Sequence, residues 1–126
     1  MLSLGIDMGK RKFQACLKDD SGILIQEFST PRNMLGAEML LQVVRKHDGN
    51  LKAVMEATGN HWMRLHDLLE ENGVETILAN PVKTRLIAEA RIRTDRLDAR
   101  ILADLLRGNL VAESYTPSLK EEIGAA

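Results

Sequence analysis

Four acidic residues stand where a carboxylate could do chemistry. Asp7 ends a short apolar run near the N-terminus, Glu56 ends a second apolar run, and Asp95 and Asp98 lie three apart in a late segment with helical spacing. A carboxylate at the end of a buried strand is costly unless its charge is compensated, and a divalent cation with oxygen ligands compensates it well. Gathered by one fold, these four acids predict a magnesium-dependent site for phosphoryl transfer.

Each acid also has a purely structural interpretation. Asp7 stands two residues before Gly9 and could accept hydrogen bonds from the backbone of a turn, and Glu56 could lie on the surface near a helix start. Asp95 could cap a helix, with Asp98 at its third position. Residues three apart also share one helix face, so both carboxylates could point at one ion. Capping leaves lone pairs on a carboxylate free, so the two roles are compatible.

The spacing of apolar residues predicts an α/β fold with the element pattern β-β-β-α-β-α-β-α-α. We expect strands over residues 3–7, 13–17, 23–28, 52–56 and 74–78, and helices over 34–47, 60–72, 82–90 and 95–107. Glycines close two of the helices, Gly49 the first and Gly73 the second. Tight turns join the first three strands, so these strands are expected to form an antiparallel meander.

This element order builds a five-stranded mixed sheet flanked by helices. The meander supplies the antiparallel edge, and two right-handed crossovers make strands one, four and five parallel. Ligands of open α/β sheets bind at the carboxyl ends of the parallel strands, near the point where the strand order switches. Because Asp7 and Glu56 both end such strands, the topology predicts that they share one site.

The bulk composition is that of an ordinary globular protein with one domain. The chain has 126 residues, of which 44% are hydrophobic, and a formal net charge of -1. No apolar run is long enough to span a bilayer, and the N-terminus has no signal-peptide pattern. The single cysteine, Cys16, excludes an intramolecular disulfide and suits a reducing compartment. We therefore expect a cytoplasmic protein with no membrane partner, and Cys16 is expected to be a small buried residue.

The positive charge is concentrated in one segment. Between Lys83 and Arg107 there are seven basic residues against four acidic ones, a formal +3 that leaves -4 for the rest of the chain. These cations flank Asp95 and Asp98, where they could contact phosphates next to a metal site. The expected nucleic-acid contacts are basic residues of this segment and of the first turn: Lys10, Lys83, Arg85, Arg91, Arg93 and Arg96. With only four aromatic residues in the chain, readout by base stacking is disfavoured.

Three segments together resemble a known family. They are Gly5-Ile6-Asp7-Met8-Gly9-Lys10, Val54-Met55-Glu56-Ala57-Thr58-Gly59 and Arg93-Thr94-Asp95-Arg96-Leu97-Asp98-Ala99. In this order they resemble the DEDD family of bacterial insertion-sequence transposases. The N-terminal domain of that family is similar to the RuvC Holliday-junction resolvase, which has a ribonuclease H-like fold. The resemblance covers about residues 2 to 110.

The resemblance implies a function and a set of residues. Asp7, Glu56, Asp95 and Asp98 fall on the family's four acidic positions, which bind divalent metal and act in DNA strand cleavage. It implies two Mg²⁺ or Mn²⁺ ions as cofactors, and DNA and a structured guide RNA as partners. It also implies action at the nucleoid and a homo-oligomer formed by the full-length protein. Residues 1–110 would be the RuvC-like nuclease domain and 111–126 a linker toward a C-terminal domain that this chain lacks, so the fragment alone is expected to be inactive.

Three other functions remain open at this point. One is a nuclease that resolves Holliday junctions, and another is a non-catalytic fragment that binds nucleic acid or forms oligomers. The third is half of an actin-like ATPase, because Gly5-Ile6-Asp7-Met8-Gly9-Lys10 also resembles the first phosphate loop of the actin and sugar-kinase superfamily. That superfamily needs a second related domain and a further glycine-rich motif, which this chain does not have.

Overall fold

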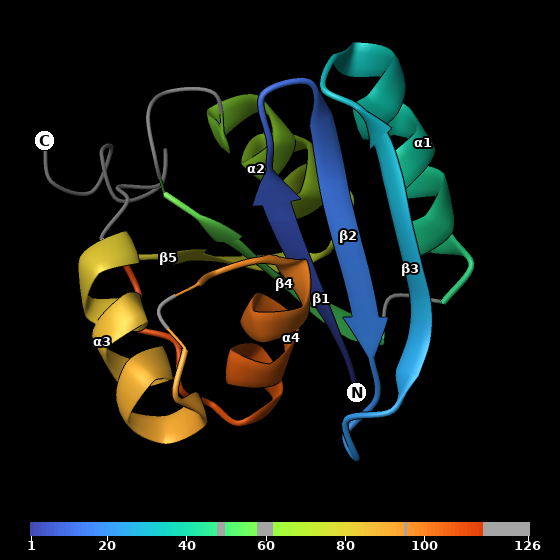
Figure 1. The fold of residues 1–126 in the computed structure, drawn as a ribbon. Helices are drawn as coiled ribbons and strands as arrows, with labels where there is room; N and C mark the ends of the chain where they lie inside the picture. The colour runs from blue at the N-terminus through green and yellow to red at the C-terminus, as the bar shows by residue number, and fades with distance from the viewer. Residues whose placement is uncertain (48–49, 58–61, 95, 115–126) are drawn as a thin grey trace, which may run out of the picture.

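One mixed sheet of five strands forms the centre of the molecule (Figure 1). The computed structural model describes residues 1–47, 50–57, 62–94 and 96–114. Along the chain the elements are β1 Leu2–Met8, β2 Lys12–Lys18, β3 Leu24–Pro31, α1 Met34–Arg45, β4 Leu51–Glu56, α2 Trp62–Glu71, β5 Glu75–Ala79, α3 Pro81–Ile92 and α4 Ala99–Arg107. This order confirms the predicted element pattern.

The strands are arranged in the order β3-β2-β1-β4-β5. Neighbouring strands within the meander pair antiparallel, whereas β1 with β4 and β4 with β5 pair parallel, as predicted. The parallel register places Gly5 opposite Val54 and Ile6 opposite Met55. Because strands in register advance together, Asp7 and Glu56 follow as neighbours at the carboxyl ends of β1 and β4.

Alternation along the strands gives the sheet two different apolar faces. One face packs on α1 and α2, with Leu4 and Ile6 of β1 among its buried residues. The opposite face packs on α3 and α4, with Val54 of β4 and Ala79 of β5 buried there (Figure 1). Asp7 has the same parity along β1 as Gly5, so its side chain lies on the α4 face of the sheet.

Helix α4 starts later than the sequence pattern suggested. The predicted helix 95–107 begins at Ala99, and the extended Asp98 is its N-cap, with φ -79° and ψ 176°. Asp98 is therefore neither in the first turn nor on a helix face shared with position 95, and that expectation was wrong. Asp95 itself lies outside the described residues. The physical reason is the packing of Ala99, the first helical residue, on the sheet.

Helix α4 approaches β1 until the two backbones touch. A Cβ atom on Gly5 would lie 2.1 Å from the carbonyl oxygen of Ala99 and 2.7 Å from the amide nitrogen of Ala103. Small buried side chains cluster at this crossing, those of Cys16, Ala99 and Ala103. Cys16 is fully buried, as expected. Only glycine at position 5 allows this close approach.

Ion pairs hold the rest of α4 against the meander. Lys18 of β2 donates a hydrogen bond to Asp104 over 2.8 Å, and both side chains are largely buried. Arg100 makes a two-pronged contact with Glu27 of β3, in which its Nη2 lies 3.0 Å from Oε1. Arg100 and Asp104 each follow one of the small residues Ala99 and Ala103, so the charged contacts flank the face of α4 that lies on the sheet.

The other element bounds differ from the predictions by a few residues. The first helix ends at Arg45, two residues early, the helix predicted over 82–90 covers Pro81–Ile92, and β3 is Leu24–Pro31. Residues 60 and 61 of the predicted helix 60–72 lie outside the described residues. Beyond α4, the backbone amides of Asn80 and Ser114 bond the carbonyl oxygens of Ala112 and Leu78, so residues 112–114 run beside the edge of β5. Within the described ranges, no helix has the length and apolar character to cross a membrane.

Replacement of Gly5 tests the backbone contact. We expect Gly5→Ala to lower the free energy of unfolding by about 1–3 kcal/mol, the usual effect of overpacking, because the new methyl group meets backbone that cannot rotate away. Urea denaturation followed by circular dichroism measures the change. Gly108→Ala is the matched control, since a methyl group there meets nothing closer than 3.4 Å and its φ of -85° suits alanine. Equal effects of the two substitutions would contradict the contact.

Candidate active site

Two of the predicted acids meet at the carboxyl ends of neighbouring parallel strands. Asp7 is the penultimate residue of β1, Glu56 is the last residue of β4, and both are half-buried. Glu56 follows Met55, which packs in the opposite core, so Glu56 also faces the α4 side of the sheet. The alternation of two strands in register thus brings two carboxylates to one edge and one face.

The third acid, Asp98, lies at the start of α4, the helix that contacts Gly5 of β1. Asp98 directly precedes Ala99, and its Oδ1 accepts a hydrogen bond of 3.0 Å from the amide of Ile101. Burial raises the pKa of Asp7, and the negative charge of Asp98 raises it further. The repulsion shows that the two carboxylates share one electrostatic environment. The N-cap bond occupies one oxygen of Asp98 and leaves acceptor capacity on the other.

Glu56 has an internal counter-charge. The Nη2 of Arg85, on α3, lies 2.6 Å from Oε1 of Glu56. Burial raises the pKa of Glu56, the guanidinium of Arg85 lowers it, and the charge of Asp7 raises it again. The net effect is a raised pKa of Glu56, because burial and the charge of Asp7 together outweigh the effect of Arg85, whose side chain is half-exposed.

The donor types at this edge suit a hard divalent cation, which prefers carboxylate oxygens. Among the described residues, no three histidine, cysteine, aspartate or glutamate side chains lie close enough to hold an ion together. Asp95 is outside those residues, and Arg85 takes up one oxygen of Glu56. The chemistry of the donors therefore fits a metal site. In this structure the guanidinium of Arg85 balances part of the negative charge of the carboxylates.

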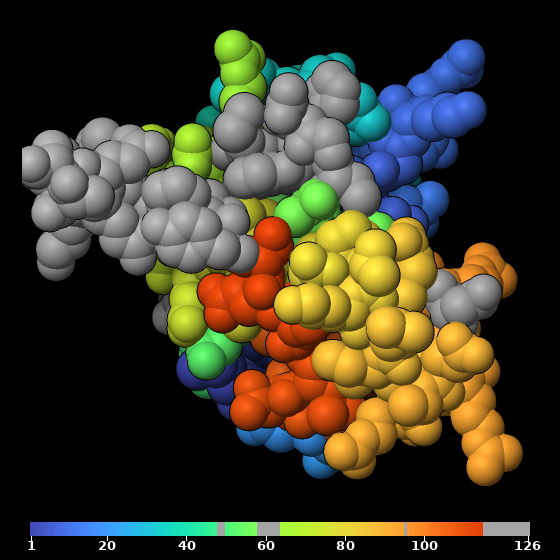
Figure 2. Space-filling view, turned by 90° about the vertical axis from the view of Figure 1, so that its left-hand side faces the viewer, coloured from blue at the N-terminus to red at the C-terminus, as the bar shows by residue number. Residues whose placement is uncertain are grey.

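The predicted nucleic-acid contacts divide into paired and unpaired cations. Arg85 is engaged with Glu56, an ion pair that no sequence pattern had indicated. The other predicted basic residues are exposed and have no ion pair within the described part of the chain: Lys10, Lys83, Arg91, Arg93 and Arg96. Four of these five follow or belong to α3, which forms much of the surface seen in Figure 2. Arg93 caps α3 in the left-handed conformation, with φ 63°.

The fold is similar to solved structures of two kinds. Thermus thermophilus RuvC matches with a TM-score of 0.55 and 15% identity over 97% of this chain and 88% of that one. The same protein in complex with a Holliday junction substrate matches with a TM-score of 0.57 and 11% identity over 90% of this chain and 100% of that one. A ROK family glucokinase from Streptomyces griseus matches with a TM-score of 0.51 and 16% identity over 76% of this chain, which spans only 38% of that enzyme. At these identities the likeness shows the fold, which is RuvC-like, that is, ribonuclease H-like.

The sequence itself matches one family model. That model, of the DEDD (IS110) type and described as "Transposase", matches residues 4–122. A comparison with curated proteins gives no match.

Two neutral substitutions test the electrostatics of the acids. We expect Arg85→Gln to raise the pKa of Glu56, because the guanidinium that lowers it is lost, and Asp98→Asn to lower the pKa of Asp7. Asparagine also caps helices well, so the start of α4 is retained. Carboxyl ¹³C NMR titrations measure both values. Arg91→Gln, an exposed charge change on the same helix, should leave Glu56 unchanged, and an equal response to both arginine substitutions would refute the ion pair.

Stability should depend on pH through Asp7. Its pKa is raised in the folded state, so the folded protein binds the proton more tightly, and stability is lost as pH rises from about 4 through the raised value. Asp7→Asn removes this loss and should be more stable than the unsubstituted protein at pH 7, with the difference vanishing at about pH 3. Thermal unfolding across this pH range measures the difference. An Asp7→Asn protein that is less stable at pH 7 would show that the carboxylate is a net stabilising group.

Proposed function

The chain belongs to the DEDD transposase family, and we propose that it is the catalytic domain with which such a transposase cleaves and transfers DNA strands. The observation that supports this function best is the placement of Asp7 and Glu56 at the ends of adjacent parallel strands, with Asp98 near enough for its charge to raise the pKa of Asp7. A RuvC-like sheet presents its ligand edge there. Asp95 completes the proposed set of four acids.

Asp7, Glu56, Asp95 and Asp98 are the residues that would hold divalent metal, with two Mg²⁺ or Mn²⁺ ions as the proposed complement. Metal bound there supplies activation of the attacking oxygen and stabilisation of the leaving one in phosphodiester cleavage. The chain's own part is to fix the carboxylates. β1 and β4 set the spacing of Asp7 and Glu56, and the cap bond of Asp98 restricts its rotation. Glu56 must also release Arg85 before both of its oxygens are available.

The exposed cations supply the proposed contacts with nucleic acid. Lys83, Arg91, Arg93 and Arg96 belong to or follow α3, and Lys10 lies in the turn after Asp7. Arg85 would join them once it leaves Glu56. The proposed partners are DNA, a structured guide RNA, and further copies of the full-length protein. We propose residues 1–110 as the nuclease domain and 111–126 as a linker toward a second domain.

The kinase-like alternative has less support. The glucokinase likeness extends over 38% of that enzyme and reflects the shared fold, whereas the family match extends over residues 4–122. A nuclease that resolves Holliday junctions would use the same proposed carboxylates of this chain, so this alternative differs from transposition in substrate and not in the proposed site.

Binding of Mn²⁺ tests the proposed site directly. Paramagnetic broadening of amide NMR signals should be strongest around Asp7, Glu56 and Asp98, because the ion relaxes nearby nuclei. Asp7→Asn should weaken Mn²⁺ binding at least about tenfold, since a charged oxygen ligand is lost. The matched control is Glu71→Gln, an exposed glutamate at the end of α2, which should bind like the unsubstituted chain.

The same substitutions in a transposase that has this chain as its proposed catalytic domain connect binding with activity. We expect Asp7→Asn to abolish strand cleavage and Glu71→Gln to retain it. Mn²⁺ broadening spread over the surface, or full cleavage by Asp7→Asn, would rule out the site.

A further inference from the structure

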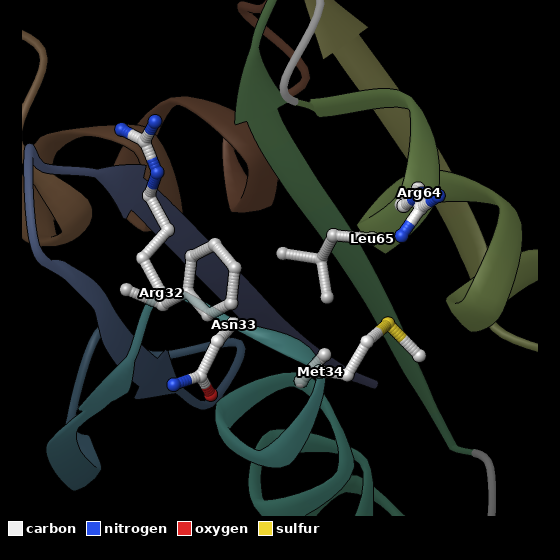
Figure 3. A pocket seen from close by; sticks show the side chains of 7 residues that line it. Arg32, Asn33, Met34, Arg64 and Leu65 are labelled. Carbon is white, nitrogen blue, oxygen red and sulfur yellow. The ribbon is translucent and has the colours of Figure 1, made fainter.

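A second site lies on the opposite face of the sheet from the acids. A cavity of about 200 Å³ opens where α1 begins and α2 passes over the end of the sheet. Its floor is apolar and buried, formed by Phe13, Ala37 and Leu65, and Met34, Arg32 and Arg64 form its rim. Figure 3 shows Arg32 and Met34 on the α1 side and Arg64 on the α2 side, with Leu65 between them.

Neither arginine of the rim has an acidic partner among the residues that the structure describes. No ion pair involves Arg32 or Arg64 within the described ranges, in contrast to Arg85, Arg100 and Arg107, which all contact carboxylates. The one hydrogen bond of the Arg32 side chain runs from Nη1 to the carbonyl oxygen of Gly9, over 2.8 Å. It positions the guanidinium without neutralising it. Guanidinium groups without a carboxylate partner at the rim of a cavity favour an anion there.

The start of α1 adds to this preference. Asn33 lines the cavity and caps the helix, with its Oδ1 accepting from the amide of Gly36 over 2.8 Å. The free amides of a first helical turn and the positive end of the macrodipole attract anions. A Cβ on Gly36 would lie 1.5 Å from the carbonyl oxygen of Pro31, so the backbone of β3 and α1 is in contact there. The rim is therefore set by backbone packing.

The turn between β1 and β2 links this cavity to the acid-bearing edge. Lys10, Arg11 and Lys12 are exposed in and after that turn, directly beyond Asp7 and Met8. The backbone amide of Arg32 bonds the carbonyl oxygen of Arg11 over 3.0 Å, which places the rim of the cavity beside the turn. A basic path thus leads from the end of β1 to the cavity.

We propose that the cavity binds one nucleotide of a single-stranded nucleic acid, with the base on the apolar floor and phosphates of the strand at Arg32 and at Arg64. The volume is below the roughly 300 Å³ at which pockets for drug-sized ligands begin, so it suits one flat group. An apolar floor adds nothing to the binding of inorganic phosphate, whereas it favours a base. The basic turn gives the adjoining phosphates a path.

This inference rests on the proposed function, because it takes nucleic acid as the partner, yet it concerns a face that needs no metal. Binding to the cavity should therefore persist in EDTA and in Asp7→Asn. Failure of Mn²⁺ binding would refute the acid site alone, and failure of the cavity to bind would leave the acid site untouched.

The first experiment is an NMR titration of the chain in EDTA. Adenosine or uridine 5′-monophosphate should shift the amides of Met34, Ala37 and Leu65, and the shifts should saturate at lower concentration than with inorganic phosphate or with the nucleoside alone. Inorganic phosphate that binds as well as the nucleotides would overturn the role of the floor. Shifts confined to α3 would overturn the site.

The second experiment measures binding of single-stranded RNA and DNA, each eight nucleotides long, by fluorescence anisotropy. Arg32→Gln and Arg64→Gln should each weaken binding about tenfold and reduce the slope of log K against log salt by about 0.7, the value for one phosphate contact on a single strand. Arg45→Gln, which removes a charge at the far end of α1, is the control and should change binding less than twofold. A preference for RNA or for DNA identifies the source of the strand. Equal effects of all three substitutions would overturn the proposal.

Met34→Glu separates binding from folding. Met34 is 53% exposed at the start of α1, where an acid favours the helix, so the variant should fold at least as well and yet repel the phosphate. Leu35→Glu is the matched control, because Leu35 is 67% exposed in the same turn and does not line the cavity. We expect about tenfold weaker binding for Met34→Glu and less than threefold for Leu35→Glu. Similar losses in the two variants would mean a general charge effect and no site.

Discussion

The close approach of α4 to β1 at Gly5 is the constraint on which the rest of the structure depends. Because a glycine faces Ala99 and Ala103, the helix lies against the strand backbone instead of on a layer of side chains. That approach buries Cys16 and lets Asp98 cap a helix beside Asp7. A larger residue at position 5 would push α4 outward and carry Asp98 away with it. Packing and the gathering of acids thus have a common cause.

Accumulated negative charge is the cost of this geometry. Burial raises the pKa values of Asp7 and Glu56, and a neighbouring carboxylate adds to each, Asp98 for Asp7 and Asp7 for Glu56, so their ionised forms destabilise the fold. Two interactions offset this negative charge. The backbone amide of Ile101 donates a hydrogen bond to Asp98, and the guanidinium of Arg85 pairs with Glu56. Both come from helices on one side of the sheet, whereas the cavity with Arg32 and Arg64 lies on the other.

Much of the fold followed from local patterns. Alternation in the strands and the turn signals predicted the sheet, and strand ends predicted that Asp7 and Glu56 would be neighbours. The start of α4 was predicted wrongly, because Asp95 and Asp98 are both acceptable caps and only the contact of Ala99 with Gly5 selects between them. The pair of Arg85 with Glu56, and the cavity that Arg32 and Arg64 both line, bring together residues about thirty positions apart. No local spacing records such contacts, since tertiary packing creates them.

In the pairing of Arg85 with Glu56, the guanidinium occupies an oxygen that a metal ion would also need. If Glu56 is a metal ligand, an ion can bind its Oε1 only in molecules in which the ion pair with Arg85 is broken. The apparent affinity for metal is then the intrinsic affinity multiplied by the fraction of such molecules. A phosphate that attracts Arg85 increases the fraction and so tightens the hold on metal. Thermodynamic reciprocity then requires metal to strengthen the hold on that phosphate by the same factor. The side chain of Arg85 on α3 would thereby couple binding of the nucleic-acid strand to binding of metal.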